Sequence, residues 1–211
     1  MQALLFDFNG TLSLDEPLLC ALYRELFTEA GRPLSEQEYY AHLAGLSDPE
    51  IVQAWLGRDD PELLDEFLRR YLVRAGDGST VPEGVRGAVR HAAEKSRVGI
   101  VSGALRVEIE TVVAGAGLDG TFDVIVAAED AVHGKPDPEG YLRALQLLAV
   151  PSSRAAAFED SPDGVGAAKA AGLYTIGVLG TVPPERLAHA DEVAPRLDAV
   201  LVGRLLGAQR S

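Results

Sequence analysis

Residues 3–11 read ALLFDFNGT, and the centre of the fold can be predicted from this stretch. Its first four residues are apolar without alternation, which is typical of a strand buried on both faces of a sheet. The run stops at Asp7, and Gly10 and Thr11 follow in a turn, where glycine supplies backbone freedom. We therefore predict a central parallel strand whose carboxyl end presents an aspartate.

Apolar runs of similar length recur along the chain, separated by helix-sized spacers and followed by polar or Gly-rich turns. Such alternation is typical of parallel strands joined by helical crossovers. It predicts an α/β fold with a doubly wound, mostly parallel, Rossmann-like sheet. The expected strands are residues 3–6, 98–101, 124–127, 155–158, 175–179 and 199–202.

About 90 residues separate the first two apolar runs, far more than one crossover needs. They contain four stretches of helical period, whose starts are marked by a serine and by Asp-Pro pairs. The expected helices are residues 17–30, 35–44, 48–56 and 61–74. We predict that residues 16–79 form a helical cap inserted after the first strand, and that residues 1–15 and 80–211 form the α/β core.

Composition restricts the partners and the compartment. The 211 residues are 47% hydrophobic and carry a net charge of −13, so their field disfavours nucleic acid and anionic membranes. The one cysteine excludes an intrachain disulfide, and no run approaches the roughly 18 apolar residues of a membrane span. Because the start lacks the features of a signal peptide, we expect a cytoplasmic protein. We also expect a monomer or weak dimer.

Ligands of an open parallel sheet bind beyond the carboxyl ends of its strands, so the residues after each run are candidates for a site. Here these residues are a carboxylate, a hydroxyl, an ammonium and an acidic pair. They are Asp7, Ser102 with Gly103, Glu159 with Asp160, and Lys135 in the loop HGKPDPE at residues 133–139. We expect them to converge on one edge of the sheet.

Four motifs occur in order: DFNGT at 7–11, VSG at 101–103, GKPDPE at 134–139 and FEDSPDGVGAAKAAG at 158–172. With them the chain resembles the phosphohydrolases of the haloacid dehalogenase superfamily, in the branch similar to β-phosphoglucomutase and phosphoglycolate phosphatase. The resemblance implies a phosphatase-type hydrolase that acts on a small phosphorylated metabolite through an aspartyl phosphate, with Mg²⁺ as cofactor.

By this resemblance Asp7 is the nucleophile, whose phosphorylation splits one difficult displacement into two. Mg²⁺ would be held by Asp7, by Asp160 and by the backbone carbonyl of Asn9. Glu159 would hold a metal-bound water, and a purely structural carboxylate is the alternative.

The same resemblance assigns the phosphate to Lys135, Ser102 and Gly103. Lys135 would neutralise the phosphate and the nucleophile as a point charge, unless it is a solvated surface lysine. Ser102 would donate its hydroxyl to a phosphate oxygen, and the amides of Gly103 and Ala104 would add donors at the start of a helix. Ser102 could equally cap that helix.

Asn9 departs from the family, whose phosphatases carry a second aspartate at this position. That aspartate protonates the leaving oxygen and then activates water, and an amide can do neither. Three interpretations stay open. The protein is a phosphatase that tolerates Asn9, or a catalytically impaired regulatory protein that binds phosphate and Mg²⁺, or a chain with an Asp-to-Asn substitution introduced at position 9.

The cap is expected to set the substrate by closing over its leaving group. The stretch GLSDPEI at residues 45–51 resembles the family's cap loop that faces the active site, which makes His42 and Ser47 candidate contacts. His42 is also a candidate for the missing acid, as the only histidine of the predicted cap. Both side chains could instead lie on solvated helix faces.

Overall fold

The computed structural model describes residues 1–207, and a six-stranded sheet forms its centre. The strands are β1 Ala3–Phe6, β2 Arg97–Val101, β3 Val124–Val126, β4 Ala155–Glu159, β5 Tyr174–Val178 and β6 Glu192–Ala194. All neighbours are parallel, in the order β3-β2-β1-β4-β5-β6. β1 lies between β2 and β4, with Phe6 beside Ile100 and Phe158. The predicted doubly wound parallel sheet is confirmed.

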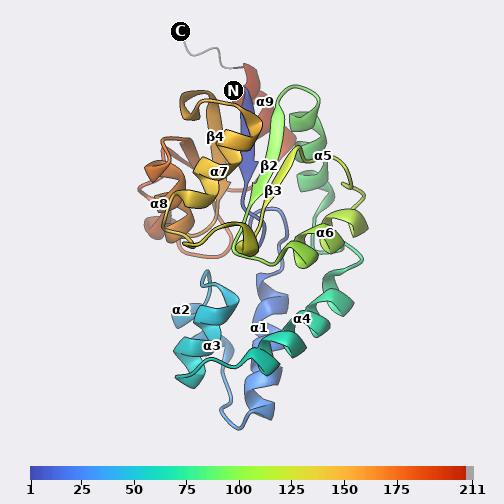
Figure 1. Ribbon diagram of the computed structural model, residues 1–211, viewed down its shortest axis with the longest axis vertical. Coiled ribbons are helices and arrows are strands. Elements are labelled where there is room, and N and C mark those ends of the chain that lie inside the picture. Colours follow the sequence, from blue (N-terminus) through green and yellow to red (C-terminus); the bar gives the residue numbers. More distant parts are fainter. Residues whose placement is uncertain (208–211) are drawn as a thin grey trace.

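Helices cover both faces of this sheet (Figure 1). They are α5 Glu83–Ala93, α6 Arg106–Gly115, α7 Glu139–Leu148, α8 Pro162–Ala170 and α9 Ala199–Gly207, with 3₁₀ turns η1 Ala128–Asp130, η2 Ser152–Arg154 and η3 Pro184–Leu187. Successive side chains of β1 point to opposite faces. Leu4 and Phe6 join a core cluster with residues of α5 and α9, whereas Ala3 and Leu5 join a second cluster with residues of α7 and α8.

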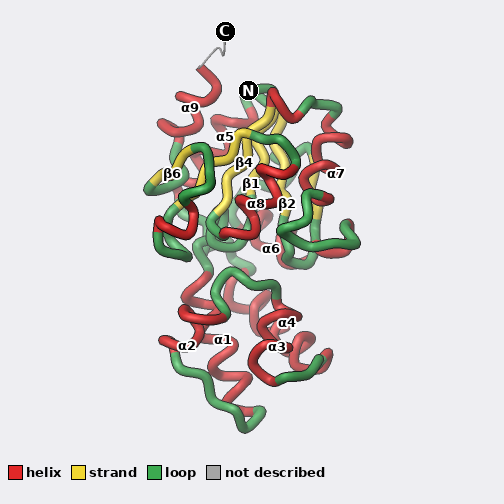
Figure 2. The backbone as a smooth tube through the Cα atoms, turned by 90° about the vertical axis from the view of Figure 1, so that its left-hand side faces the viewer, coloured by secondary structure: helices red, strands yellow, loops and turns green. Residues whose placement is uncertain are grey.

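The chain between β1 and α5 forms a helical cap at one end of the molecule (Figures 1 and 2). Its helices are α1 Glu16–Glu29, α2 Glu36–His42, α3 Asp48–Leu56 and α4 Pro61–Ala75. Ser35 begins α2 through a capping box with Glu38, and the amide and hydroxyl of Ser47 both donate to Glu50 at the start of α3. Tyr23 of α1 stacks on Phe67 of α4 at 4.5 Å between ring centres. Each helix predicted for the cap is present. Within residues 1–207, no helix is long and apolar enough to cross a membrane.

The predicted strand at residues 199–202 is wrong, because these residues begin α9. The sixth strand is β6, which pairs in parallel with β5. A short apolar run does not distinguish a strand from a buried helix, and here packing against α5 selects the helix. Leu201, Val202 and Leu205 lie on one face of α9 and are buried, and α9 packs against α5.

Candidate active site

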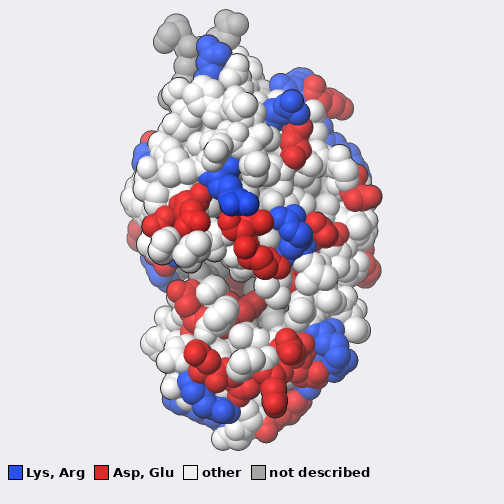
Figure 3. Space-filling view, viewed as in Figure 1, with Lys and Arg blue, Asp and Glu red and all other residues white. Residues whose placement is uncertain are grey.

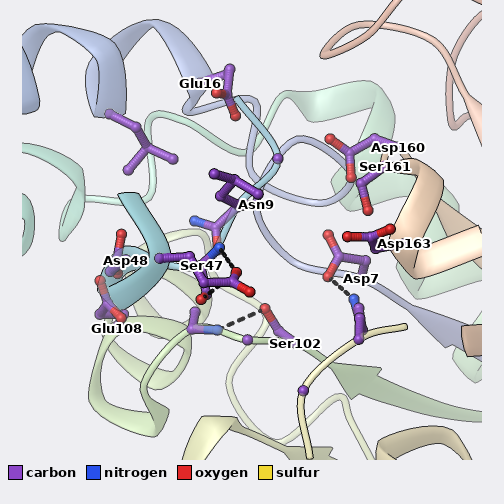
Figure 4. A pocket seen from close by; sticks show the side chains of 18 of the residues that line it. Asp7, Asn9, Glu16, Ser47, Asp48, Ser102, Glu108, Asp160, Ser161 and Asp163 are labelled. Atoms are coloured by element: carbon purple, nitrogen blue, oxygen red, sulfur yellow. Dashed lines mark hydrogen bonds and ion pairs between the residues drawn. The ribbon is translucent and has the colours of Figure 1, made fainter. Parts of the chain in front are cut away.

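A cavity of about 150 Å³ lies where the carboxyl ends of β1, β2 and β4 face the cap. Its wall contains most of the predicted site residues, from both parts of the molecule (Figure 4). These are Asp7, Asn9, Ser47, Ser102, Gly103, Lys135 and Asp160. Glu159 is completely buried and pairs with Lys135. His42 is not brought to the cavity: it is exposed at the end of α2, outside the wall.

A second cavity of about 310 Å³ adjoins the first and shares Ser47, Ser102 and Lys135 with it. Its far wall carries apolar side chains of α4, among them Leu64 and Phe67. The two cavities together provide room for an organic group beyond the residues predicted to bind phosphate.

Lys135 joins two of the acids that follow the strands. Its Nζ lies 2.5 Å from Oδ1 of Asp7 and 2.6 Å from Oε1 of Glu159. Burial disfavours its charge, but the charges of Asp7 and Glu159 outweigh burial and raise the pKa of Lys135 above its ordinary value. Lys135 therefore stays protonated, as a cation fixed beside the predicted nucleophile.

Asp7, Glu159 and Asp160 form a buried acidic group, with one oxygen of each within 4.8 Å of the others. Burial raises the pKa of Glu159 to about 7 and that of Asp160 well above its ordinary value, and the charge of Asp7 adds to both. Oε2 of Glu159 has no hydrogen-bond partner among the described residues. Clustered carboxylates that one lysine only partly neutralises fit a hard divalent cation, which binds oxygen ligands. That Glu159 would hold a metal-bound water, and is not a purely structural carboxylate, stays a prediction.

Two glycines allow backbone to approach these acids closely. Gly10 has φ +75°, and a Cβ there would lie 1.9 Å from Oδ2 of Asp160. A Cβ on Gly164, in the first turns of α8, would lie 1.9 Å from Oε2 of Glu159. Any larger side chain at either position would displace a predicted site carboxylate, which explains both glycines.

Asn9 has a structural partner that the sequence did not indicate. Its Nδ2 donates to Oδ2 of Asp15 at 2.9 Å, and the hydroxyl of Tyr71 donates to the same oxygen at 2.5 Å. Asp15 is 1% exposed, and burial raises its pKa to about 6. An aspartate at position 9 would place two carboxyls together in a buried environment, so the amide suits this surrounding.

Ser102 and Gly103 follow β2 as predicted, but no helix begins there. α6 begins at Arg106, so the amides of Gly103 and Ala104 lie in the preceding loop, and the prediction of a helix start at these residues is wrong. The hydroxyl of Ser102 accepts from the amide of Ala104 at 3.1 Å. This turn holds the hydroxyl at the cavity wall (Figure 4).

Three acids of the wall were missed: Glu16 at the start of α1 and Glu108 in α6, which are buried, and the half-buried Asp48 at the start of α3. Burial is the main cause that raises their pKa values, to about 7, 6 and 8 respectively. On the face seen in Figure 3, Asp and Glu side chains also lie along the boundary between the cap and the sheet. Acids at helix starts are common, so the sequence offered no signal for their convergence.

Glu108→Gln is expected to stabilise the protein at alkaline pH. Because the pKa of Glu108 is about 8 when folded, the folded state binds more protons than the unfolded state, and stability falls as pH rises from about 5 to 8. Glutamine removes this ionisation and can still accept from the amide of Leu105. Urea unfolding with Mg²⁺ should show that the gain over wild type is larger at pH 8.5 than at pH 5.5, by roughly 1–3 kcal/mol.

Glu110→Gln is the matched control, since Glu110 lies exposed on the same helix. It should leave the pH dependence of unfolding unchanged. Equal stability of wild type and Glu108→Gln at pH 8.5 would show that burial does not raise the pKa of Glu108.

Comparison with known proteins identifies relatives along nearly the whole chain. A family model of haloacid dehalogenase-like hydrolases matches residues 1–172. Validoxylamine A 7'-phosphate phosphatase of Streptomyces hygroscopicus subsp. limoneus is 31% identical over 93% of this chain and 94% of its own. A phosphorylated carbohydrates phosphatase of Thermotoga maritima is 30% identical over 83% and 84%. CbbY from Rhodobacter sphaeroides, solved in complex with phosphate, superposes with a TM-score of 0.85 at 27% identity, covering 95% of this chain and 96% of that one.

Proposed function

The chain belongs to the haloacid dehalogenase-like hydrolases and is a phosphatase-type enzyme, and we propose that it hydrolyses the phosphate ester of a small sugar-like metabolite through an aspartyl phosphate on Asp7. The observation that carries this proposal is the contact of Lys135 with both Asp7 and Glu159 beside Asp160, at the mouth of the sheet. The names of the two phosphatase relatives support the substrate class.

In the proposed reaction a carboxylate oxygen of Asp7 attacks phosphorus in line with the leaving oxygen. Lys135 neutralises charge on the phosphate and on Asp7, and the hydroxyl of Ser102 and the amide of Gly103 donate to phosphate oxygens. The leaving group extends toward the cap, where Ser47 lies in the wall of both cavities.

Asp7, Asp160 and the backbone carbonyl of Asn9 would hold Mg²⁺, which supplies charge neutralisation for the phosphate. The buried acidic group and the unpartnered Oε2 of Glu159 support this assignment. Asp160 itself is held by the hydroxyl of Thr11, which donates to its Oδ1 at 3.3 Å.

One observation favours a second candidate function. The side chain of Asn9 is committed to Asp15, so position 9 supplies no acid or base. A protein with this site and no substitute for that group would bind phosphate and Mg²⁺ as a regulator without useful turnover.

Phosphate release from a panel of three phosphate esters and one acyl phosphate tests the proposed function. The panel contains a hexose phosphate, a pentose phosphate, p-nitrophenyl phosphate and acetyl phosphate, each with Mg²⁺ and after chelation by EDTA. We expect release with Mg²⁺ on at least one sugar phosphate, a loss of about tenfold or more on chelation, and recovery when Mg²⁺ is restored. Binding of phosphate and Mg²⁺ without release from any ester would overturn the proposal in favour of the regulator.

A further inference from the structure

Glu16 lies in the wall of the same cavity as Asp7 and Asn9, on the first turn of α1 where the chain enters the cap. It is 8% exposed, and its Oε1 is buried without a hydrogen-bond partner among the described residues. Figure 4 shows its carboxylate at the edge of the ring of labelled side chains. When a buried polar atom at the border of a cavity has no hydrogen-bond partner, it is available to bind a ligand in that cavity.

The other acids of the wall are less suited to proton transfer. Asp48 accepts a hydrogen bond from the hydroxyl of Tyr23 at 2.6 Å, and Glu108 accepts one from the amide of Leu105 at 2.8 Å. Glu50 and Asp163 are exposed. Among the described acids of this wall, Glu16 is the one with a fully buried oxygen that lacks a hydrogen bond of good geometry, and the unpartnered hydroxyl of Tyr39 lies near its carboxyl group.

We propose that Glu16 is the general acid and base of this phosphatase and performs the proton transfers that Asn9 cannot. The inference rests on the proposed function. It accounts for a site that has kept its nucleophile, its cation and its acidic group while losing the aspartate of the family at position 9.

The two steps balance around one carboxyl group. When Asp7 attacks, the bond from phosphorus to the leaving oxygen breaks, its electron pair stays on that oxygen, and the proton of Glu16 moves to it, which gives the free alcohol. The carboxylate of Glu16 then takes a proton from a water whose oxygen attacks the phosphorus. The bond to Asp7 breaks, and inorganic phosphate and protonated Glu16 result. Leaving oxygen and water occupy the same position in line with Asp7, so one residue can serve both steps.

The surroundings of Glu16 suit this double role at neutral pH. Burial raises its pKa to about 7. The nearby hydroxyl of Tyr39 opposes this increase, and the negative charges of Asp15, Asp48 and Asp7 add to it. A general acid and base works best with a pKa near the working pH. The titratable groups that face it are Asp15 beside it, Cys20 on α1, Tyr39 and Tyr40 of α2, Asp48 of α3, and Asp7 and Asp160 at the ends of the strands.

Glu16→Gln should separate substrates by their leaving groups. For a hexose phosphate, whose leaving oxygen needs a proton, kcat/KM should fall by about 10²-fold or more. For p-nitrophenyl phosphate, whose leaving group needs none, kcat/KM should change by less than about tenfold. The variant should then release a burst of p-nitrophenolate equal to the enzyme, followed by slow turnover, because water is no longer activated against the aspartyl phosphate.

The pH profile and two further variants complete the test. In the wild type kcat/KM for the hexose phosphate should fall as pH rises above about 7, where Glu16 loses its proton, and Glu16→Gln should lack this decline. Glu16→Asp should retain part of the ester activity and the alkaline decline. Adding Asn9→Asp to Glu16→Gln should restore ester hydrolysis, because it returns a carboxyl to the cavity wall.

Glu62→Gln is the matched control, because Glu62 is exposed in the first turn of α4, and it should behave as wild type. Equal losses on both substrates without a burst would assign Glu16 to substrate binding and overturn the inference, as would unchanged kinetics. If phosphate release is lost in Asp7→Asn but unchanged in Glu16→Gln, only this inference is overturned and the proposed function stands. Absence of any release that depends on Asp7 would instead overturn the proposed function.

Discussion

Asp7→Asn is expected to abolish phosphate release, with kcat lower by about 10⁴-fold or more on every ester. The amide cannot displace the leaving oxygen, and Asp7 is the acid that Lys135 contacts at the end of β1. The fold should survive, because Asp160 and Glu159 lose a neighbouring negative charge. Phosphate-release assays and acid-quenched labelling of the phosphoenzyme measure the effect.

The matched control for this change is Asp65→Asn, on the exposed side of α4. It should retain wild-type release and wild-type labelling. If Asp7→Asn kept more than about one part in a hundred of the activity, or still formed an acid-stable phosphoenzyme, another residue would be the nucleophile.

Lys135→Met is expected to lower kcat/KM by about 10²–10³-fold. Lys135 is the only cation among the described residues that line the cavity, and methionine keeps much of its length without its charge. Without Mg²⁺ the variant should also lose about 3 kcal/mol of unfolding free energy, because Asp7 and Glu159 then stay buried without their counter-charge. Saturating Mg²⁺ should recover part of that loss. Steady-state kinetics and urea unfolding with and without the ion measure both effects.

Lys169→Met removes a matched but more exposed ion pair, in which Nζ lies 2.5 Å from Oδ1 of Asp191. A surface pair contributes little, so this control should change unfolding by less than about 1 kcal/mol and leave kcat/KM unchanged. Equal effects of the two substitutions would show that Lys135 has no special role at the site.

The architecture followed from local pattern, with one error. Five of the six predicted strands are present because strands buried on both faces need continuous apolar runs, and residues 3–6 mark the central one. The run at 199–202 failed because an apolar run of this length is compatible with either structure, and packing against α5 selected the helix.

The strand ends indicated most of the site, because the carboxyl ends of parallel strands meet at one edge wherever the chain runs between them. Asp7, Ser102, Lys135 and Asp160 could therefore be placed together before any coordinates. His42 could not be placed, because its orientation depends on how α2 packs within the cap.

The sequence by itself determined the doubly wound sheet, the helical cap and the group of residues predicted to bind phosphate, since periodicity and strand ends are local properties. Only the tertiary structure decided that Asn9 binds Asp15 and that Glu16 lines the cavity as a buried acid. Burial and partners depend on elements far apart in the chain, and they decide whether a carboxyl at a helix start is a solvated cap or an acid that holds its proton near neutral pH.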